Sequence, residues 1–161
     1  LVAHPKCNQE NLLKVLVGGK KLKRQRQSIV EECEQILDIV GLKEKEGELA
    51  TNLPYGKQRL LEIGRALATD PRLVLLDEPG AGMNTVEKEE LTALIRHITQ
   101  KMGKNVLLIE HDMKFVMGIS DRILVLDHGE LIANGSPKEI QSNAQVIEAY
   151  LGKGIEEDDE E

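Results

Sequence analysis

Two short apolar runs, each followed by ionisable residues, constrain the fold of this chain more than any other feature. Residues 73–76 lead directly into Asp77 and Glu78, and residues 106–109 are followed closely by His111. An unbroken apolar run of this length is typical of a strand that is buried on both faces of a parallel sheet. The two runs therefore predict strands that carry reactive side chains at their ends.

Helical patterns surround these runs. Apolar residues recur at helical spacing over residues 28–40 and 57–68, and a further helix is expected over about residues 86–102. Residues 112–119 and 143–151 predict two short helices, and a hairpin is expected over residues 123–133 because Gly129 suits a tight turn. A helical turn should start at Ser136 and Pro137. Strands that alternate with helices predict an α/β fold with a mostly parallel sheet.

The first of these helices carries signals at both ends. Ser28 and Glu31 have the spacing of a capping box, and Gly41 follows as a C-terminal stop. Just before it, residues 20–26 hold five cations, which form either a solvated helix start or a contact for lipid headgroups or an acidic partner.

In the second helix, Gly64 is expected to let a neighbouring element approach closely.

A turn at residues 53–57 precedes that second helix. The free amide groups and positive dipole end of a helix N-terminus form a site for phosphate oxygens, and Gly56 lets the backbone come close to a ligand. The plainer alternative is an ordinary helix start, with Pro54 near the first turn, where its missing N–H costs little.

The strand ends suggest nucleotide hydrolysis. Open α/β sheets bind ligands at the carboxyl ends of their strands. Asp77 would help hold Mg²⁺, through water, and Glu78 would orient and deprotonate an attacking water molecule. His111 could hydrogen-bond a terminal phosphate and respond to its loss. The alternatives are a strand that simply leaves the core and a structural histidine.

Composition limits the function classes. The chain has 161 residues, 40% hydrophobic and 30% charged, enough for one domain with a core. Aromatic residues make up only 2%, with no Trp, so stacking on nucleic-acid bases is not expected. Six of the acidic residues that set the net charge of −7 form the segment 156–161, which is expected to be disordered. The rest of the chain is nearly neutral.

Cysteine usage fits a reducing compartment, and hydropathy gives no sign of a membrane span. Cys7 and Cys33 lack metal-ligand spacing, and Cys33 falls on the apolar face of a predicted helix, so a buried thiol is expected. No apolar run approaches the 18 residues or so that cross a bilayer. The chain begins with Leu1 and contains no Gly-x-x-x-x-Gly-Lys-Ser/Thr loop, which suggests a truncated polypeptide.

The order and spacing of these residues closely resemble the second half of the ATPases of ATP-binding cassette (ABC) transporters, over roughly residues 28–152. By that resemblance Leu53, Pro54, Tyr55, Gly56 and Lys57 match the signature motif. Residues 73–77 match the Walker B strand, Glu78 the catalytic glutamate and His111 the switch histidine. Ala81, Gly82, Met83 and Asn84 match the D-loop. The sequences of residues 81–84, 109–140 and 146–152 look most like those of the branched-chain amino acid importers.

The resemblance implies a partial P-loop NTPase (RecA-like) parallel sheet with an ABC helical subdomain. It places a helical subdomain and signature helix at residues 1–70, the second half of the catalytic core at 71–152, and an acidic tail at 153–161. ATP and Mg²⁺ would be the cofactors. The partners would be a second ATPase subunit in a head-to-tail dimer and membrane permease subunits, with no nucleic acid. The chain would then lie in the cytoplasm, at the inner face of the plasma membrane.

Four residues depart from the family pattern. The family usually places Ser where Pro54 stands, so a hydroxyl and an amide donor near the γ-phosphate are lost. It usually has Gln where Lys57 stands, and we hypothesise that this cation offsets the loss. Tyr55 and Asn84 replace the commoner Gly and Asp, and look like subfamily choices.

The sequence contains neither a Walker A loop nor the glutamine-bearing loop of the family. We therefore expect the chain alone not to hydrolyse ATP, because it could offer only its signature surface to a partner. Other interpretations are an ATPase for urea or lipopolysaccharide transport, and a non-catalytic module that completes the signature side of a partner ATPase. DNA-repair ATPases of the same superfamily usually carry coiled-coil or zinc insertions, and no such insertion is visible here.

Overall fold

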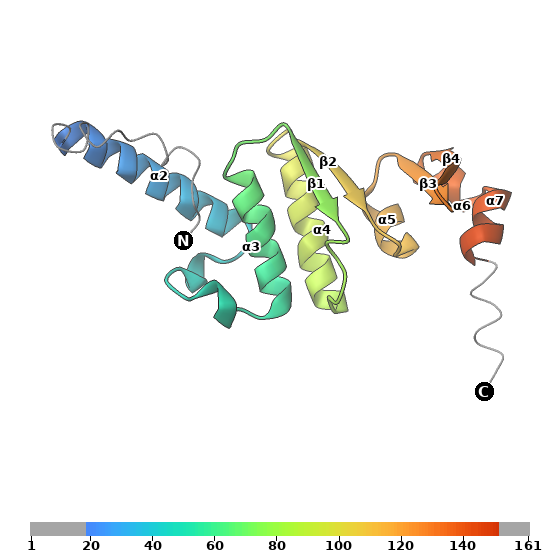
Figure 1. The fold of residues 1–161 in the computed structure, drawn as a ribbon, viewed down its shortest axis with the longest axis horizontal. Coiled ribbons are helices and arrows are strands. Elements are labelled where there is room, and N and C mark those ends of the chain that lie inside the picture. Colours follow the sequence, from blue (N-terminus) through green and yellow to red (C-terminus); the bar gives the residue numbers. More distant parts are fainter. Residues whose placement is uncertain (1–18, 152–161) are drawn as a thin grey trace. The chain divides into compact units, whose positions relative to one another are not determined.

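The computed structural model describes residues 19–151 of the chain, which form two compact units with the boundary between Ile109 and Glu110 (Figure 1). The expected division near residue 70 stays a prediction. No helix within residues 19–151 combines the length and the apolar character needed to span a membrane. The predicted tail lies outside the described residues, as does Cys7.

The first unit contains helices and a parallel strand pair. Its elements are α2 (Gly19–Ile39), the 3-10 turns η2 (Lys43–Lys45) and η3 (Ala50–Asn52), α3 (Tyr55–Leu67), β1 (Leu73–Asp77), α4 (Thr85–Gln100) and β2 (Asn105–Ile109). Strands β1 and β2 pair in parallel, with Leu73 opposite Asn105 and Asp77 opposite Ile109. Helix α4 connects the two strands, so the predicted strand–helix–strand order and parallel pairing are confirmed.

The strand pair is covered on one face only, so the prediction of burial on both faces is wrong for this structure. Val74 in β1 is 3% exposed, whereas its neighbour Leu75 is 68% exposed and Ile109 in β2 is 63% exposed. The reason is the single helix layer: α4 contacts β2 and buries its own apolar stripe of Leu91, Leu94, Ile95 and Ile98. Within the described part of this unit, no second layer covers Leu73, Leu75, Leu107 and Ile109.

Helix α2 begins nine residues before the expected start at Ser28. Ser28 is therefore an exposed residue inside the helix, and the predicted capping box with Glu31 is wrong. The preceding Lys, Leu, Arg and Gln residues are good helix formers and extend the helix toward its N-terminus. Lys23, Arg24 and Arg26 are exposed.

The predicted end of α2 at Gly41 is confirmed. Gly41 has a φ of +68°, its N–H donates to the Asp38 carbonyl at 3.0 Å, and the Leu42 N–H donates to the Leu37 carbonyl at 2.7 Å. This pair of bonds is a Schellman motif, which glycine permits because it adopts positive φ without a Cβ clash.

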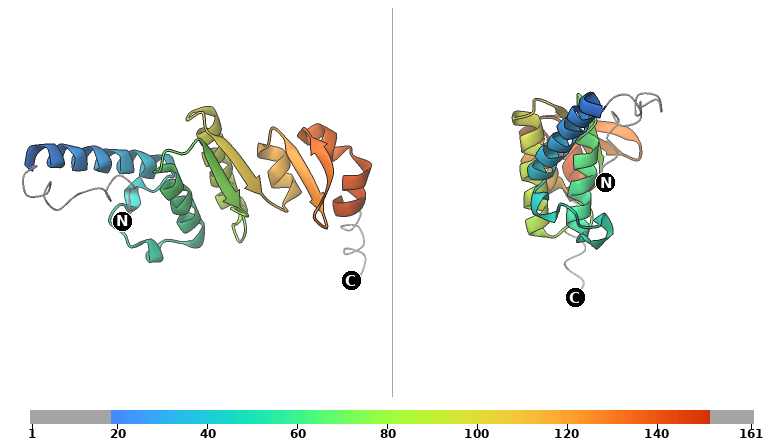
Figure 2. Two further views of the ribbon diagram at one scale, coloured as in Figure 1. Left: turned by 45° about the horizontal axis from the view of Figure 1, so that its top comes forward. Right: turned by 90° about the vertical axis from the view of Figure 1, so that its left-hand side faces the viewer.

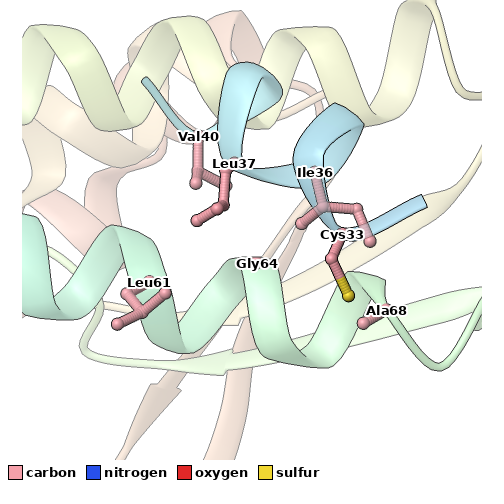
Figure 3. A pocket seen from close by; sticks show the side chains of 7 residues that line it. All are labelled: Cys33, Ile36, Leu37, Val40, Leu61, Gly64 and Ala68. Carbon is pink, nitrogen blue, oxygen red and sulfur yellow. The ribbon is translucent and has the colours of Figure 1, made fainter. Parts of the chain in front are cut away.

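Helices α2 and α3 pack closely at Gly64, as expected. A Cβ on Gly64 would lie 3.2 Å from Val40 Cγ1 and 3.3 Å from Ile36 Cγ2, so a larger residue would push the helices apart. The side chains around this contact line a small apolar hollow, in which the half-buried Cys33 lies (Figure 3).

The second unit contains α5 (Met113–Ile119), β3 (Ile123–Asp127), β4 (Glu130–Gly135), α6 (Pro137–Gln141), α7 (Ala144–Val146) and the π-helical turn η4 (Ile147–Leu151). Strands β3 and β4 form the predicted antiparallel hairpin, visible in Figure 2. Its two-residue turn has positive φ at both His128 (+46°) and Gly129 (+84°), the backbone of a type I′ turn. The Tyr150 hydroxyl donates to the Leu126 carbonyl and ties η4 to the hairpin.

Helix α6 starts with a capping box. The Glu139 carboxylate accepts from the Ser136 N–H at 2.7 Å and from the Ser136 hydroxyl at 2.8 Å. The backbone hydrogen bond first, and the hydroxyl second, lower the pKa of Glu139 from its ordinary value. Because the folded-state pKa is lowered, these bonds stabilise the fold above the pKa of the unfolded chain. That stability is lost as the pH falls through the folded-state pKa.

Replacing Ser136 with Ala should raise the pKa of Glu139 part of the way to its ordinary value, since the backbone donor remains. Carboxyl-detected NMR titration of the chain measures this. Ser142→Ala is the control, because the Ser142 hydroxyl bonds only the Lys138 and Glu139 carbonyls and should leave that pKa unchanged. An unchanged pKa in Ser136→Ala would contradict the proposed cause.

Candidate functional site

Both parallel strands end at the same edge of the sheet, and two carboxylates follow there. Asp77 closes β1 opposite Ile109, the last residue of β2, and the Glu78 N–H donates to the Ile109 carbonyl at 2.9 Å. This bond extends the ladder by one residue. Asp77 and Glu78 are both exposed, as a ligand-binding role requires.

Glu78 has a strained backbone. Its φ of +43° lies in the left-handed region, which costs a non-glycine residue on the order of 1 kcal/mol or more. Such conformations cluster at functional sites. They persist only where the surrounding structure holds the backbone in place despite the strain. The hydrogen bond to Ile109 and the turn bond from the Ala81 N–H to the Glu78 carbonyl, 3.1 Å, hold it here.

The segment matched to the D-loop, residues 81–84, forms the turn from Glu78 into α4. Gly82 has a φ of +72° and Met83 is buried. Asn84 is the N-cap of α4: its side chain accepts from the Glu87 N–H at 3.0 Å, and the Glu87 carboxylate accepts from the Asn84 N–H at 3.0 Å. Asn and Asp cap helices about equally well, which explains physically why Asn can stand at this position.

Helix α3 begins at Tyr55, two residues before the expected start. Pro54 is its N-cap, with φ −55° and ψ 152°, and its carbonyl accepts the first intrahelical bond, from the Gln58 N–H at 3.0 Å. The amides of Tyr55, Gly56 and Lys57 therefore have no acceptor within the helix. Amides in this position suit phosphate oxygens, so the geometry of residues 53–57, here called the signature turn, fits a nucleotide phosphate.

The structure brings the signature turn and the D-loop together. A Cβ on Gly82 would lie 3.2 Å from Cε1 of the Tyr55 ring, and a Cβ on Gly56 would lie 2.4 Å from Oε1 of Glu87. The Lys57 ammonium pairs with the Glu90 carboxylate of α4 at 2.8 Å. This pairing reduces the charge that Lys57 could offer to a phosphate, and so argues against the hypothesis that it compensates for Pro54.

Arg59 was missed by the sequence analysis. Its Nε donates to the Tyr55 hydroxyl at 3.0 Å, its guanidinium lies over the Tyr55 ring, and it pairs with Glu62 at 2.9 Å. The bond to Glu62, followed by the bond to Tyr55, raises the pKa of Arg59. The i,i+4 spacing of Tyr55 and Arg59 is a sequence signal that could have revealed the contact.

His111 belongs to the second unit and follows the last residue of β2 by two positions. It is exposed, and the next residue, Asp112, caps α5 by accepting from the Phe115 N–H at 3.0 Å. Asp77, Glu78, residues 81–84 and the signature turn thus lie in the first unit. His111 lies in the second unit.

The donor set of the first unit fits a nucleotide with Mg²⁺. Within residues 19–151, no group of three or more His, Cys, Asp or Glu residues could hold a metal ion by itself. Mg²⁺ does not require such a cage, because it keeps several waters and takes one or two carboxylates together with phosphate oxygens. Asp77 and Glu78 at the strand end supply carboxylates of this kind.

Replacing Gly56 with Ala should destabilise the chain by about 1–2 kcal/mol, because the new methyl group displaces the Glu87 carboxylate and breaks the α4 cap. In a Glu87→Ala background the same replacement should cost less than about 0.5 kcal/mol, since the clash is already gone. Urea unfolding of the four chains measures this coupling. Equal costs in both backgrounds would contradict it.

Comparisons with known proteins bear on this site. Residues 4–81 match the family model for the ABC transporter, and residues 130–156 match the model for the branched-chain amino acid ATP-binding cassette transporter. The chain is 43% identical over 153 residues to the high-affinity branched-chain amino acid transport ATP-binding protein LivG of Salmonella typhimurium. It is 42% identical to BraF, described by the same words, of Pseudomonas aeruginosa. Each alignment covers 95% of this chain and 60% of the relative.

A solved structure is similar to this chain in fold. The ADP conformation of MJ1267, an ATP-binding cassette of an ABC transporter, matches with a TM-score of 0.72 and 31% identity, over 91% of this chain and 58% of that chain. The predicted partial nucleotide-hydrolase fold is thereby confirmed. The chain spans about 60% of the length of the curated relatives it matches. These matches show that the chain belongs to the family of ABC transporter ATP-binding proteins.

Proposed function

We propose that this chain is the signature-bearing part of an ATP-hydrolysing subunit that drives import of branched-chain amino acids. The observation that carries the proposal is that the two carboxylates at the end of β1 lie in one unit with the residues matched to the signature motif and the D-loop. The chain is also 43% identical to a LivG protein. The names of the relatives favour branched-chain amino acids over urea or lipopolysaccharide as the transported class.

ATP supplies the phosphoryl group whose transfer to water powers the transporter. In the proposed mechanism Asp77 would help hold Mg²⁺, and Glu78 would orient the attacking water and take its proton. His111 hydrogen-bonds the terminal phosphate and responds to its loss. The exposure of all three side chains is compatible with these roles.

The signature turn, Pro54–Lys57 together with Leu53, would face the nucleotide held by a second ATPase subunit in a head-to-tail dimer. The free amides of its first turn support this role. The D-loop, Ala81 to Asn84, would lie at the same dimer contact. Permease subunits would bind the helical part of the chain and bring it to the inner face of the plasma membrane.

A hybrid protein tests this proposal. The matched 60% of LivG from Escherichia coli K12 is replaced by this chain, which is 42% identical to it over 153 residues. The hybrid should bind and hydrolyse Mg-ATP and restore leucine import to cells that lack LivG. The 161-residue chain measured alone should stay at background.

Replacing Glu78 with Gln in the hybrid should lower ATP turnover by about 10²-fold or more, because the general base is lost while nucleotide binding remains. Glu130→Gln, an exposed carboxylate in β4, is the matched control and should leave turnover unchanged. A folded hybrid that binds no ATP would contradict the proposed function, and equal turnover in the Glu78→Gln variant would contradict the assigned base.

A further inference from the structure

The start of α3 and the start of α4 are tied together by three contacts that no sequence motif requires. They join Tyr55 to Gly82, Gly56 to Glu87 and Lys57 to Glu90. Each contact links a residue of the signature turn to a residue of the D-loop or of the helix that the D-loop starts. The two segments are separated by more than twenty residues of chain, including all of β1.

The Tyr55 ring restricts the backbone of the D-loop. Three ring carbons lie within 4 Å of the position that a Cβ on Gly82 would take, the nearest at 3.2 Å, and Gly82 holds a φ of +72°. Glycine is otherwise the least restrained residue in a chain. A ring seated against it limits the conformations that the D-loop can adopt, and Gly at position 55, the commoner family residue, could not do this.

The Glu87 carboxylate acts at both segments. One oxygen accepts from the Asn84 N–H and completes the α4 cap, and the other lies over Gly56 in the first turn of α3. The space left by the missing Gly56 side chain is therefore occupied by the cap of the other helix. Movement of the signature turn away from this position would leave that cap without its neighbour.

The Lys57–Glu90 ion pair extends the same contact, from the residue after Gly56 in α3 to a residue about one turn beyond Glu87 in α4. Both oxygens of Glu90 lie within hydrogen-bond distance of the Lys57 ammonium, at 2.8 and 3.0 Å. An ion pair as exposed as this contributes little free energy by itself. The pair adds a third link between the start of α3 and α4.

We propose that Tyr55, Glu87 and Glu90 are positioning residues that hold the signature turn and the D-loop as one rigid surface for a second nucleotide-binding chain. The proposal rests on the proposed function for its partner, but the rigid joining is a property of this chain alone. A partner that meets one preformed surface loses less conformational entropy on docking than one that must order two independent loops. The contacts made by Tyr55 thus give this residue a task that the family's commoner Gly could not perform.

Hydrogen exchange of the 161-residue chain, measured by mass spectrometry, tests the rigid joining. Tyr55→Gly should speed exchange at least about tenfold in peptides that cover residues 80–84, since the ring no longer restrains Gly82. Tyr55→Phe keeps the ring and should leave those peptides as slow as in the parent chain. Unchanged D-loop exchange in Tyr55→Gly, or equal acceleration in both variants, would overturn the proposal.

Variants of the Lys57–Glu90 ion pair test the rigid joining independently, in case Tyr55→Gly fails to fold. Lys57→Glu should speed exchange in both segments, and the double variant Lys57→Glu, Glu90→Lys should restore it by reversing the pair. Glu89→Gln, at the exposed neighbouring position, is the matched control and should change neither segment. Failure of the reversed pair to restore slow exchange would overturn the role of Glu90.

The hybrid described above separates this proposal from the proposed function. ATP-dependent dimerisation of the hybrid carrying the Glu78→Gln change is followed by analytical ultracentrifugation. Tyr55→Gly should weaken dimerisation roughly tenfold more than Tyr55→Phe does, because the surface is no longer preset. If the parent hybrid does not dimerise with ATP, the proposed function fails. If it does and the two Tyr55 variants behave alike, the positioning role fails.

Discussion

The parallel ladder between β1 and β2 is the interaction on which the rest of the first unit depends. Its register sets Asp77 opposite Ile109, and the added bond from the Glu78 N–H to the Ile109 carbonyl carries the ladder one residue beyond the strand. That bond holds Glu78 at its positive φ, from which the chain turns into the D-loop and then α4. Helix α4 in turn supplies Glu87 and Glu90, which contact the signature turn. The positions of Asp77, Glu78 and residues 81–84 thus follow from one strand pair.

Patterns that depend on neighbouring residues were predictable from the sequence. The strand–helix–strand order follows from apolar runs and helical spacing, and the hairpin turn at His128–Gly129 and the helix stop at Gly41 follow from glycine's access to positive φ. The strand-end carboxylates followed from the same reasoning, because parallel strands end at one edge of a sheet. The start of α2 was misplaced because helix propensity in the basic segment outweighed the capping signal at Ser28.

Features that depend on contacts between distant segments were not predictable. No residue near Glu78 in the sequence predicts a left-handed backbone, because the hydrogen bond to β2 imposes that conformation. The Lys57–Glu90 pair joins residues 33 positions apart, and only the packing of α3 beside α4 makes it possible. Tyr55 could be identified from the sequence as a departure from the family pattern, but its contact with Gly82 explains what the departure achieves.

Side-chain alternation links the chemistry of Asp77 to the apolar face of the strand pair. Leu73, Leu75 and Asp77 point to the same face of β1, and Leu107 and Ile109 join them from β2. The four apolar side chains on this face are exposed in the structure. An element that packed on them would also remove water from around Asp77, which strengthens the attraction between a carboxylate and a cation but adds the cost of desolvating the carboxylate. The strand-end carboxylate and the apolar residues before it therefore share one face, so an element that covered the apolar residues would also change the electrostatic environment of Asp77.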